Sequence, residues 1–163
     1  MKRFAFLALV PIVVCFLPKG AGQAPDKTWS RLAVPGLWED VDKRFAKVHG
    51  FAWYRCWVKV PDAWKGTDLT LSVDRVVNAF ELFWDGAKVG GGGAFPPAFR
   101  DASGEVSSFT IPEKLIRPGQ PHLVALRVWN QSGKGGFYST APALINESKA
   151  ISLAGDWQFR PGD

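Results

Sequence analysis

The sequence predicts an all-β protein in which short strands form two packed layers or a barrel. The chain has 163 residues, enough for one domain of ordinary size with a full core. Runs of alternating apolar and polar residues recur at short intervals between turn residues, and helical periodicity is almost absent. The 8 tryptophans supply bulk that can fill the space between two sheets.

The clearest strand pattern lies at residues 51–61 and ends at Pro61, which has no N–H to donate. Alternation gives this strand two different faces, with Tyr54, Cys56, Val58 and Val60 on one and Trp53, Arg55, Trp57 and Lys59 on the other. The first face is predicted to belong to the core. The second is apolar, cationic and flat, so we expect another sheet, a ligand or a neighbouring domain to cover it.

Further strands are predicted after this one, at residues 69–74, 79–84, 87–89, 107–111, 122–128 and 151–160. Asp85-Gly86 favours a type I′ turn, which would join residues 79–84 and 87–89 as a hairpin with Trp84 in the core. Residues 90–103 are predicted to form a flexible loop, and residues 112–119 a single helical turn.

The N-terminus has the pattern of a secretory signal peptide spanning residues 1–24. Lys2 and Arg3 precede an apolar run from Phe4 to Leu17, and small residues follow up to Ala24. The run is short for a membrane span, although an N-terminal membrane anchor is the alternative. We therefore expect a mature chain that is secreted or periplasmic and has no membrane partner once the signal is removed.

The charge of the chain argues against a nucleic-acid partner. Of the formal net charge of +5, three positive residues (Lys2, Arg3 and Lys19) lie in the predicted leader, which leaves +2. The remaining basic residues are scattered and often stand next to acids, so they form no stripe of the kind that phosphate backbones require.

The residues required for common catalytic centres are missing. The two histidines, His49 and His122, have no nucleophile motif nearby and are expected to be surface or capping residues. With one cysteine outside the leader, the chain lacks the ligand spacing of a zinc site. Carboxylates such as Glu81 and Asp85 show no fixed pairing of the glycosidase type. The sequence therefore predicts no catalytic residue, no metal and no cofactor.

Carbohydrate recognition is the chemistry that the residue types favour. An indole ring packs against the apolar C–H face of a sugar, and Asn, Asp, Glu or Arg side chains bind its hydroxyls. Trp38, Trp57, Trp84 and Trp129 are candidates on this ground. The alternative for each is packing in the core or between domains.

Five short motifs follow one another between Trp29 and Trp129. They are Val34-Pro-Gly-Leu-Trp38 with the polar loop up to Gly50, Ala52-Trp-Tyr-Arg55 with Val58-Lys-Val-Pro61, Glu81-Leu-Phe-Trp-Asp-Gly86 with Val89-Gly90, Ile116-Arg-Pro-Gly119, and Leu126-Arg-Val128. In this order they resemble the non-catalytic N-terminal domain of glycoside hydrolase family 2, which includes β-galactosidases and β-glucuronidases.

The resemblance implies a jelly-roll β-sandwich of the galactose-binding-like type. In that family the catalytic acids lie on a separate barrel domain, which sandwich loops corresponding to residues 38–50 and 129–138 can reach. Asn130 departs from the pattern, because several family members carry an acidic residue there. The candidate carbohydrate-binding residues are Trp38, Asp42, Arg55, Trp57, Trp129 and Asn130.

The expected organisation is a signal peptide (1–24), a sandwich (25–150) and a tail (151–163) that closes the sandwich or opens a following module. A similar module, ending in a segment like residues 153–157, occurs in sialate O-acetylesterase-like proteins, whose catalytic Gly-Asp-Ser segment is absent here. We expect a module that binds or positions carbohydrate and works with a catalytic domain in the same polypeptide. The alternative is a purely structural sandwich between other domains.

Overall fold

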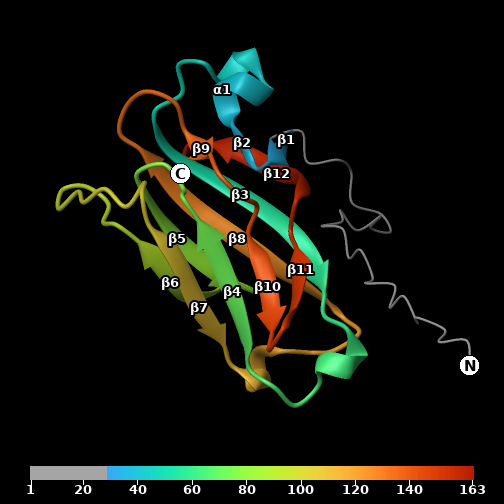
Figure 1. Cartoon of the computed structure of the whole chain (residues 1–163). Coiled ribbons are helices and arrows are strands. Elements are labelled where there is room, and N and C mark those ends of the chain that lie inside the picture. The colour runs from blue at the N-terminus through green and yellow to red at the C-terminus, as the bar shows by residue number, and fades with distance from the viewer. Residues whose placement is uncertain (1–28) are drawn as a thin grey trace, which may run out of the picture.

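Two antiparallel β-sheets lie face to face and enclose the core (Figure 1). The computed structural model describes residues 29–163, so the predicted signal peptide lies outside the described residues. This architecture confirms the predicted all-β jelly-roll sandwich.

The larger sheet, called the large sheet below, has the strand order β1-β12-β3-β8-β5-β6. Its strands are β1 (Ser30–Val34), β12 (Gly155–Pro161), β3 (Gly50–Lys59), β8 (Pro121–Asn130), β5 (Ala79–Trp84) and β6 (Ala87–Gly92). The small sheet has the order β11-β10-β4-β7. It is built from β11 (Lys149–Ser152), β10 (Ala143–Asn146), β4 (Leu69–Asp74) and β7 (Val106–Ile111).

Short elements close the two ends of the sandwich. At one end β2 (Gly36–Leu37) pairs with β9 (Gly136–Phe137), next to α1 (Trp38–Val41) and the 3-10 turn η1 (Lys43–Phe45). The other two 3-10 turns are η2 (Asp62–Trp64) and η3 (Glu113–Leu115). The polar loop expected after Trp38 therefore contains two short helical turns.

Alternating residues of the strands fill the space between the sheets. The inward residues of β3 (Tyr54, Cys56 and Val58) are at most 1% exposed, as the alternation predicts. Trp84 is buried as predicted, and Trp157 and Phe159 of β12 extend the same layer. Because β12 lies between β1 and β3, the tail of the chain contributes to this core.

The hairpin of β5 and β6 differs from the prediction in its length. Asp85 and Gly86 both have positive φ (48° and 86°), as a type I′ turn requires. The return strand continues to Gly92, so the prediction of a flexible loop from residue 90 was wrong for its first three residues. A Cβ atom at Gly90 would lie 2.0 Å from the Phe109 ring, and one at Gly92 would lie 2.6 Å from Phe80. These glycines let the edge strand pack closely against its neighbours.

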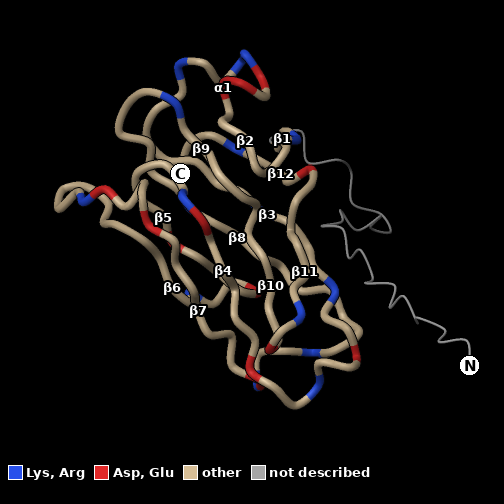
Figure 2. Tube along the Cα trace, in the orientation of Figure 1, with Lys and Arg blue, Asp and Glu red and all other residues tan. Residues whose placement is uncertain are grey.

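Charged residues lie mostly at the ends of the sandwich. Figure 2 shows Lys and Arg beside Asp and Glu around α1 and again at the opposite end of the molecule. Among residues 29–163 the structure contains no helix that is long and apolar enough to cross a membrane.

His122 joins the β5–β6 turn to the loop before β8. The structure corrects the expectation of a surface or capping residue, because the side chain is 0% exposed and stacks on Trp84 with ring centroids 4.7 Å apart. Its Nδ1 lies 2.7 Å from Asp85 Oδ2, and the Arg117 N–H donates to its Nε2 over 2.9 Å. An imidazole ring that carries a proton on Nδ1 can donate to Asp85 and accept from the Arg117 N–H.

Replacing His122 by Phe should lower the free energy of unfolding by roughly 1–3 kcal/mol, because the aromatic stacking is kept but the Arg117 N–H loses its acceptor. Urea denaturation followed by tryptophan fluorescence measures this change. His49→Phe at the exposed histidine is the matched control, with an expected change within about 0.5 kcal/mol. Equal losses in the two variants would contradict a structural role for the His122 hydrogen bonds.

Candidate functional site

The outward side of the large sheet carries aromatic and arginine side chains instead of an ordinary polar surface. We call it the aromatic face and define it by Phe51, Trp53, Arg55 and Trp57 of β3, Phe83 of β5, Leu123, Arg127 and Trp129 of β8, and the flanking residues Trp29 and Phe95. The antiparallel register places these residues in rows across the strands, with Trp53 opposite Arg127 and Arg127 opposite Glu81.

One half of the aromatic face is organised around Arg55. Its guanidinium carbon lies 3.8 Å from the centre of the Trp29 ring and 5.6 Å from that of Trp57. The Arg55 Nε donates to Gln158 Oε1 over 2.5 Å, and the register pairs these two residues across β3 and β12. Contacts with aromatic faces and a hydrogen bond hold the guanidinium in place beside these rings.

A second arginine organises the other half. The guanidinium of Arg127 lies 4.0 Å from the centre of the Phe51 ring and 5.2 Å from that of Phe95. It donates from Nε to Asp163 Oδ1 over 2.7 Å and forms a second bond from a terminal nitrogen to the other oxygen. It also reaches Glu81, whose carboxylate is 2.6 Å from the Lys88 ammonium. Charges on this half are therefore balanced in pairs.

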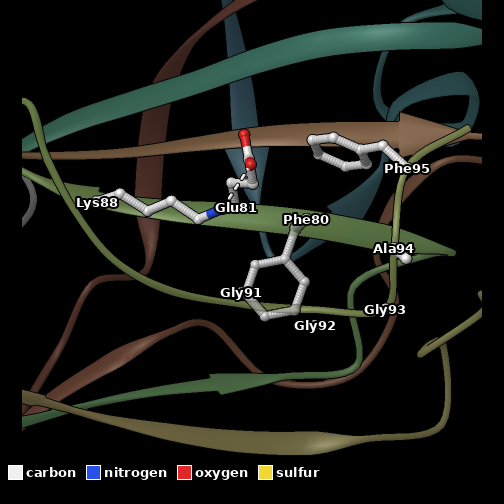
Figure 3. A pocket seen from close by; sticks show the side chains of 8 residues that line it. All are labelled: Phe80, Glu81, Lys88, Gly91, Gly92, Gly93, Ala94 and Phe95. Atoms are coloured by element: carbon white, nitrogen blue, oxygen red, sulfur yellow. Dashed lines mark hydrogen bonds and ion pairs between the residues drawn. The ribbon is translucent and has the colours of Figure 1, made fainter.

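Two hollows open on or beside the aromatic face. An apolar groove of about 310 Å³ is lined by Trp29, Trp53, Arg55, Phe83, Gly86, Leu123 and Ala125. Within it, the Trp53 and Phe83 rings lie 5.5 Å apart. The second hollow, of about 400 Å³, is called the Glu81 pocket and is lined by Phe80, Glu81, Lys88, Gly91, Gly92, Gly93, Ala94 and Phe95 (Figure 3).

Three of the predicted site residues lie on the aromatic face. Arg55 and Trp57 stand side by side on β3 and are half-buried, and Trp129 lies at the end of β8. The Trp129 ring contacts Phe51 edge-on with centroids 4.8 Å apart, and its indole N–H donates to Gln131 over 2.9 Å. The structure thus brings these three residues to one surface.

The other three predicted residues lie at the end of the sandwich that carries α1, and two of them are buried. Trp38 is 0% exposed and stands so close to Gly135 that a Cβ there would be 2.1 Å from its ring. Asn130 is 1% exposed and donates its amide to the carbonyls of Val48 and Gly133. Direct sugar contact by Trp38 and Asn130, expected from the sequence, is therefore corrected to a role in packing this end.

Asp42 has a local structural role. Its carboxylate accepts the Arg44 N–H over 2.9 Å at the start of η1 and holds the Arg44 guanidinium at 2.6 Å. These contacts to Arg44 also hold the pKa of the Asp42 carboxyl below its usual value. The carboxylate is thus already engaged by its own turn.

The two loops that the family resemblance singles out do lie next to each other. The Trp38 N–H donates to the Gly135 carbonyl over 2.9 Å, and Lys134 contacts Asp40 at 2.8 Å. Beneath them, the Tyr54 hydroxyl and the Trp38 indole nitrogen are buried, with no hydrogen-bond partner among the residues that the structure describes. Burial, with the nearby Glu39 carboxylate, raises the pKa of Tyr54. This end is consequently a closed cap.

Sequence reasoning missed Glu81, Lys88 and Phe95 as site residues. The Asp85-Gly86 turn signal implies that Glu81 and Lys88 lie on paired strands, and Lys88 pairs with Phe83, which is on the same face of β5 as Glu81. Phe95 belongs to the segment after β6, and no sequence pattern indicates that it packs on Phe51. Among residues 29–163 no three His, Cys, Asp or Glu side chains are grouped so that they could hold a metal ion.

Comparisons with known proteins identify the fold. No protein-family model and no curated protein matches the sequence. Among solved structures, a β-glucuronidase from glycoside hydrolase family 2 is similar over 72% of this chain and 13% of its own, with 21% identity and a TM-score of 0.52. This chain has the fold of a β-sandwich domain within such an enzyme.

Two further β-glucuronidases show the same similarity. The Bacteroides uniformis enzyme matches 87% of this chain and 16% of its own, with 18% identity and a TM-score of 0.56. The Ruminococcus gnavus enzyme matches 80% of this chain and 23% of its own, with 14% identity and a TM-score of 0.50. The chain therefore spans less than a quarter of the length of these multidomain enzymes.

Arg127→Gln should raise the pKa of the Asp163 side chain toward its ordinary value of 3.8, because hydrogen bonds from Arg127 are the largest cause of its lowering. The Arg127–Asp163 ion pair stabilises the fold at pH values above 3.8, the ordinary pKa of an aspartate. This contribution is lost as the pH falls through the lowered pKa of Asp163 in the folded chain. Carbon NMR titration of the Asp163 carboxyl measures the shift. Arg160→Gln, which removes only a weaker charge effect, is the control, and an equal rise in both variants would contradict the assignment.

Proposed function

We propose that this chain is a non-catalytic module that binds and positions carbohydrate for a secreted or periplasmic glycoside hydrolase of the family 2 type. The fold supports the proposal, as does the small fraction of the β-glucuronidase chains that it matches. Under this proposal the reaction belongs to a catalytic domain elsewhere in the same polypeptide. Secretion rests on the signal-peptide pattern of residues 1–24.

The observation that carries the proposal is the aromatic face. Rings of Trp53, Trp57 and Phe83 lie on the outward side of a rigid sheet, where the C–H face of a sugar can pack against them. Polar groups fixed by neighbouring contacts, such as the Arg55 and Arg127 guanidinium groups, stand between the rings. Apolar platforms with a few oriented polar groups are typical of small-molecule sites.

A non-catalytic role agrees with the way the carboxylates of this region are used. Glu81 contacts the Lys88 ammonium and the Arg127 guanidinium, and Asp163 holds Arg127 from its other side. Glycoside cleavage needs two carboxyl groups that flank the scissile bond with different protonation states. Glu81 and Asp163 instead serve as partners of fixed cations, which is suited to binding and orientation.

A second candidate function is a structural domain that packs on a neighbouring protein surface. The apolar groove favours it, because Trp29, Trp53, Phe83, Leu123 and Ala125 line that groove and offer few polar groups to a sugar. Tryptophan and arginine are also enriched in the centres of protein interfaces. The two functions differ in whether the isolated chain binds carbohydrate.

Titration of the chain with a panel of neutral and acidic oligosaccharides should give binding in the millimolar range, detected as NMR shifts of residues on the aromatic face. Trp53→Ala should weaken the best ligand about tenfold, which corresponds to about 1.4 kcal/mol. The control is Tyr138→Ala, which removes an exposed ring outside the aromatic face and should leave the affinity unchanged.

Urea denaturation of each variant separates a loss of binding from a loss of folding. If the folded chain binds no oligosaccharide of the panel, the carbohydrate proposal is wrong and the structural role is favoured.

A further inference from the structure

The Glu81 pocket differs in chemistry from the apolar groove, although both lie at the large sheet. A carboxylate, an ammonium group and an aromatic ring meet at its opening, contributed by Glu81, Lys88 and Phe95 (Figure 3). Its volume of about 400 Å³ is at the lower end of the range for small-ligand sites.

The ion pair in the pocket is placed at an open surface where both partners can bind additional groups. Glu81 Oε1 lies 2.6 Å from the Lys88 ammonium, and their side chains are 24% and 57% exposed. A carboxylate accepts several hydrogen bonds, and an ammonium group has three donors, so each keeps free capacity. An acceptor and a donor side by side match two neighbouring hydroxyls, one of which donates while the other accepts.

The aromatic wall of the pocket is held in place from behind. Phe95 packs edge-on against Phe51 with ring centroids 5.2 Å apart, and the Arg127 guanidinium lies 5.2 Å from the Phe95 centroid. A ring fixed in this way presents a flat apolar surface beside Glu81, as Figure 3 shows. The C–H face of a pyranose packs on such a surface.

The opposite wall consists of backbone. Residues Gly91, Gly92 and Gly93 line the pocket without side chains, and β6 is an edge strand of the large sheet. Edge strands present peptide N–H and C=O groups along their free side. Sugar hydroxyls could use these groups in addition to the Glu81–Lys88 pair.

The balance of charge indicates a neutral ligand. Lys88 is paired with Glu81, while Arg127 is shared between Glu81 and Asp163. Two cations thus face two carboxylates. A ligand carboxylate would meet Glu81 and would have to compete for cations that already have partners, which is unfavourable.

We propose that the Glu81 pocket binds one neutral pyranose unit, with its C–H face on Phe95 and two neighbouring hydroxyls on Glu81 and Lys88. This inference rests on the carbohydrate-binding function proposed above and names the subsite and the ligand class. The pyranose in this pocket anchors a longer oligosaccharide that extends toward Trp53.

Titration of the whole chain with methyl β-glucopyranoside and, separately, with glucuronate tests the proposal by NMR. The neutral glycoside should bind at least about fivefold more tightly than glucuronate and should shift the amide signals of Gly91, Gly92 and Gly93. Glu81→Gln and Phe95→Ala should each weaken its binding about tenfold. Tyr138→Ala, which removes an exposed ring outside both the aromatic face and the pocket, is the matched control and should change the affinity less than twofold.

The outcomes separate this proposal from the broader one. If the glycoside binds but Glu81→Gln and Phe95→Ala leave its affinity unchanged, the pocket assignment is wrong while carbohydrate binding stands. Glucuronate binding as tight as that of the glycoside overturns the neutral ligand class. If neither monosaccharide nor any oligosaccharide binds the folded chain, both proposals fail. Retained urea stability in Phe95→Ala and Glu81→Gln shows that lost affinity reflects the pocket.

Discussion

The pairing of β3 with β8 is the interaction on which the rest of the structure depends. These strands form an unbroken antiparallel ladder from Gly50 opposite Asn130 to Lys59 opposite Pro121, in the middle of the large sheet. Because side chains alternate along each strand, this one register decides which residues enter the core and which form the aromatic face. A shift by one residue would exchange the two sets. Core and candidate site are therefore fixed by the same hydrogen bonds.

This dependence explains why the aromatic face can be both apolar and ordered. Arg55 and Arg127 lie against aromatic rings and are held by Gln158 and Asp163, so their charged groups are partnered and their stems cover apolar surface. Each partner comes from β12 or the residues after it, which the large sheet places beside β3. The polar and apolar parts of the face thus stabilise one another, and the surface is preorganised for a flat ligand.

The functional proposals rest on chemistry at this surface, since a fold of this kind does not by itself specify an activity. The apolar groove around Trp53 suits a flat apolar partner, whereas the Glu81 pocket offers oriented donors and acceptors. Placing both on one sheet would let a module hold a sugar chain at one point and guide it at another. The end carrying α1 is closed by Trp38 and Asn130, so its contribution is to hold the two connecting loops together.

The sequence by itself determined the strand class, the two faces of residues 51–61 and the Asp85-Gly86 turn, because alternation and turn propensity are local properties. It also placed Arg55 and Trp57 on the outward face of that strand, where the structure has them. Only the tertiary structure decided that Trp38, Asn130 and His122 are buried, since each is covered by residues far away in the chain. The Glu81 pocket was likewise decided by tertiary packing, because it needs Phe95, which the fold places on Phe51. The Gly90–Gly92 segment, whose residues have low strand propensity, becomes a strand because it pairs with β5, and the Phe80 and Phe109 rings occupy the space that side chains would need there.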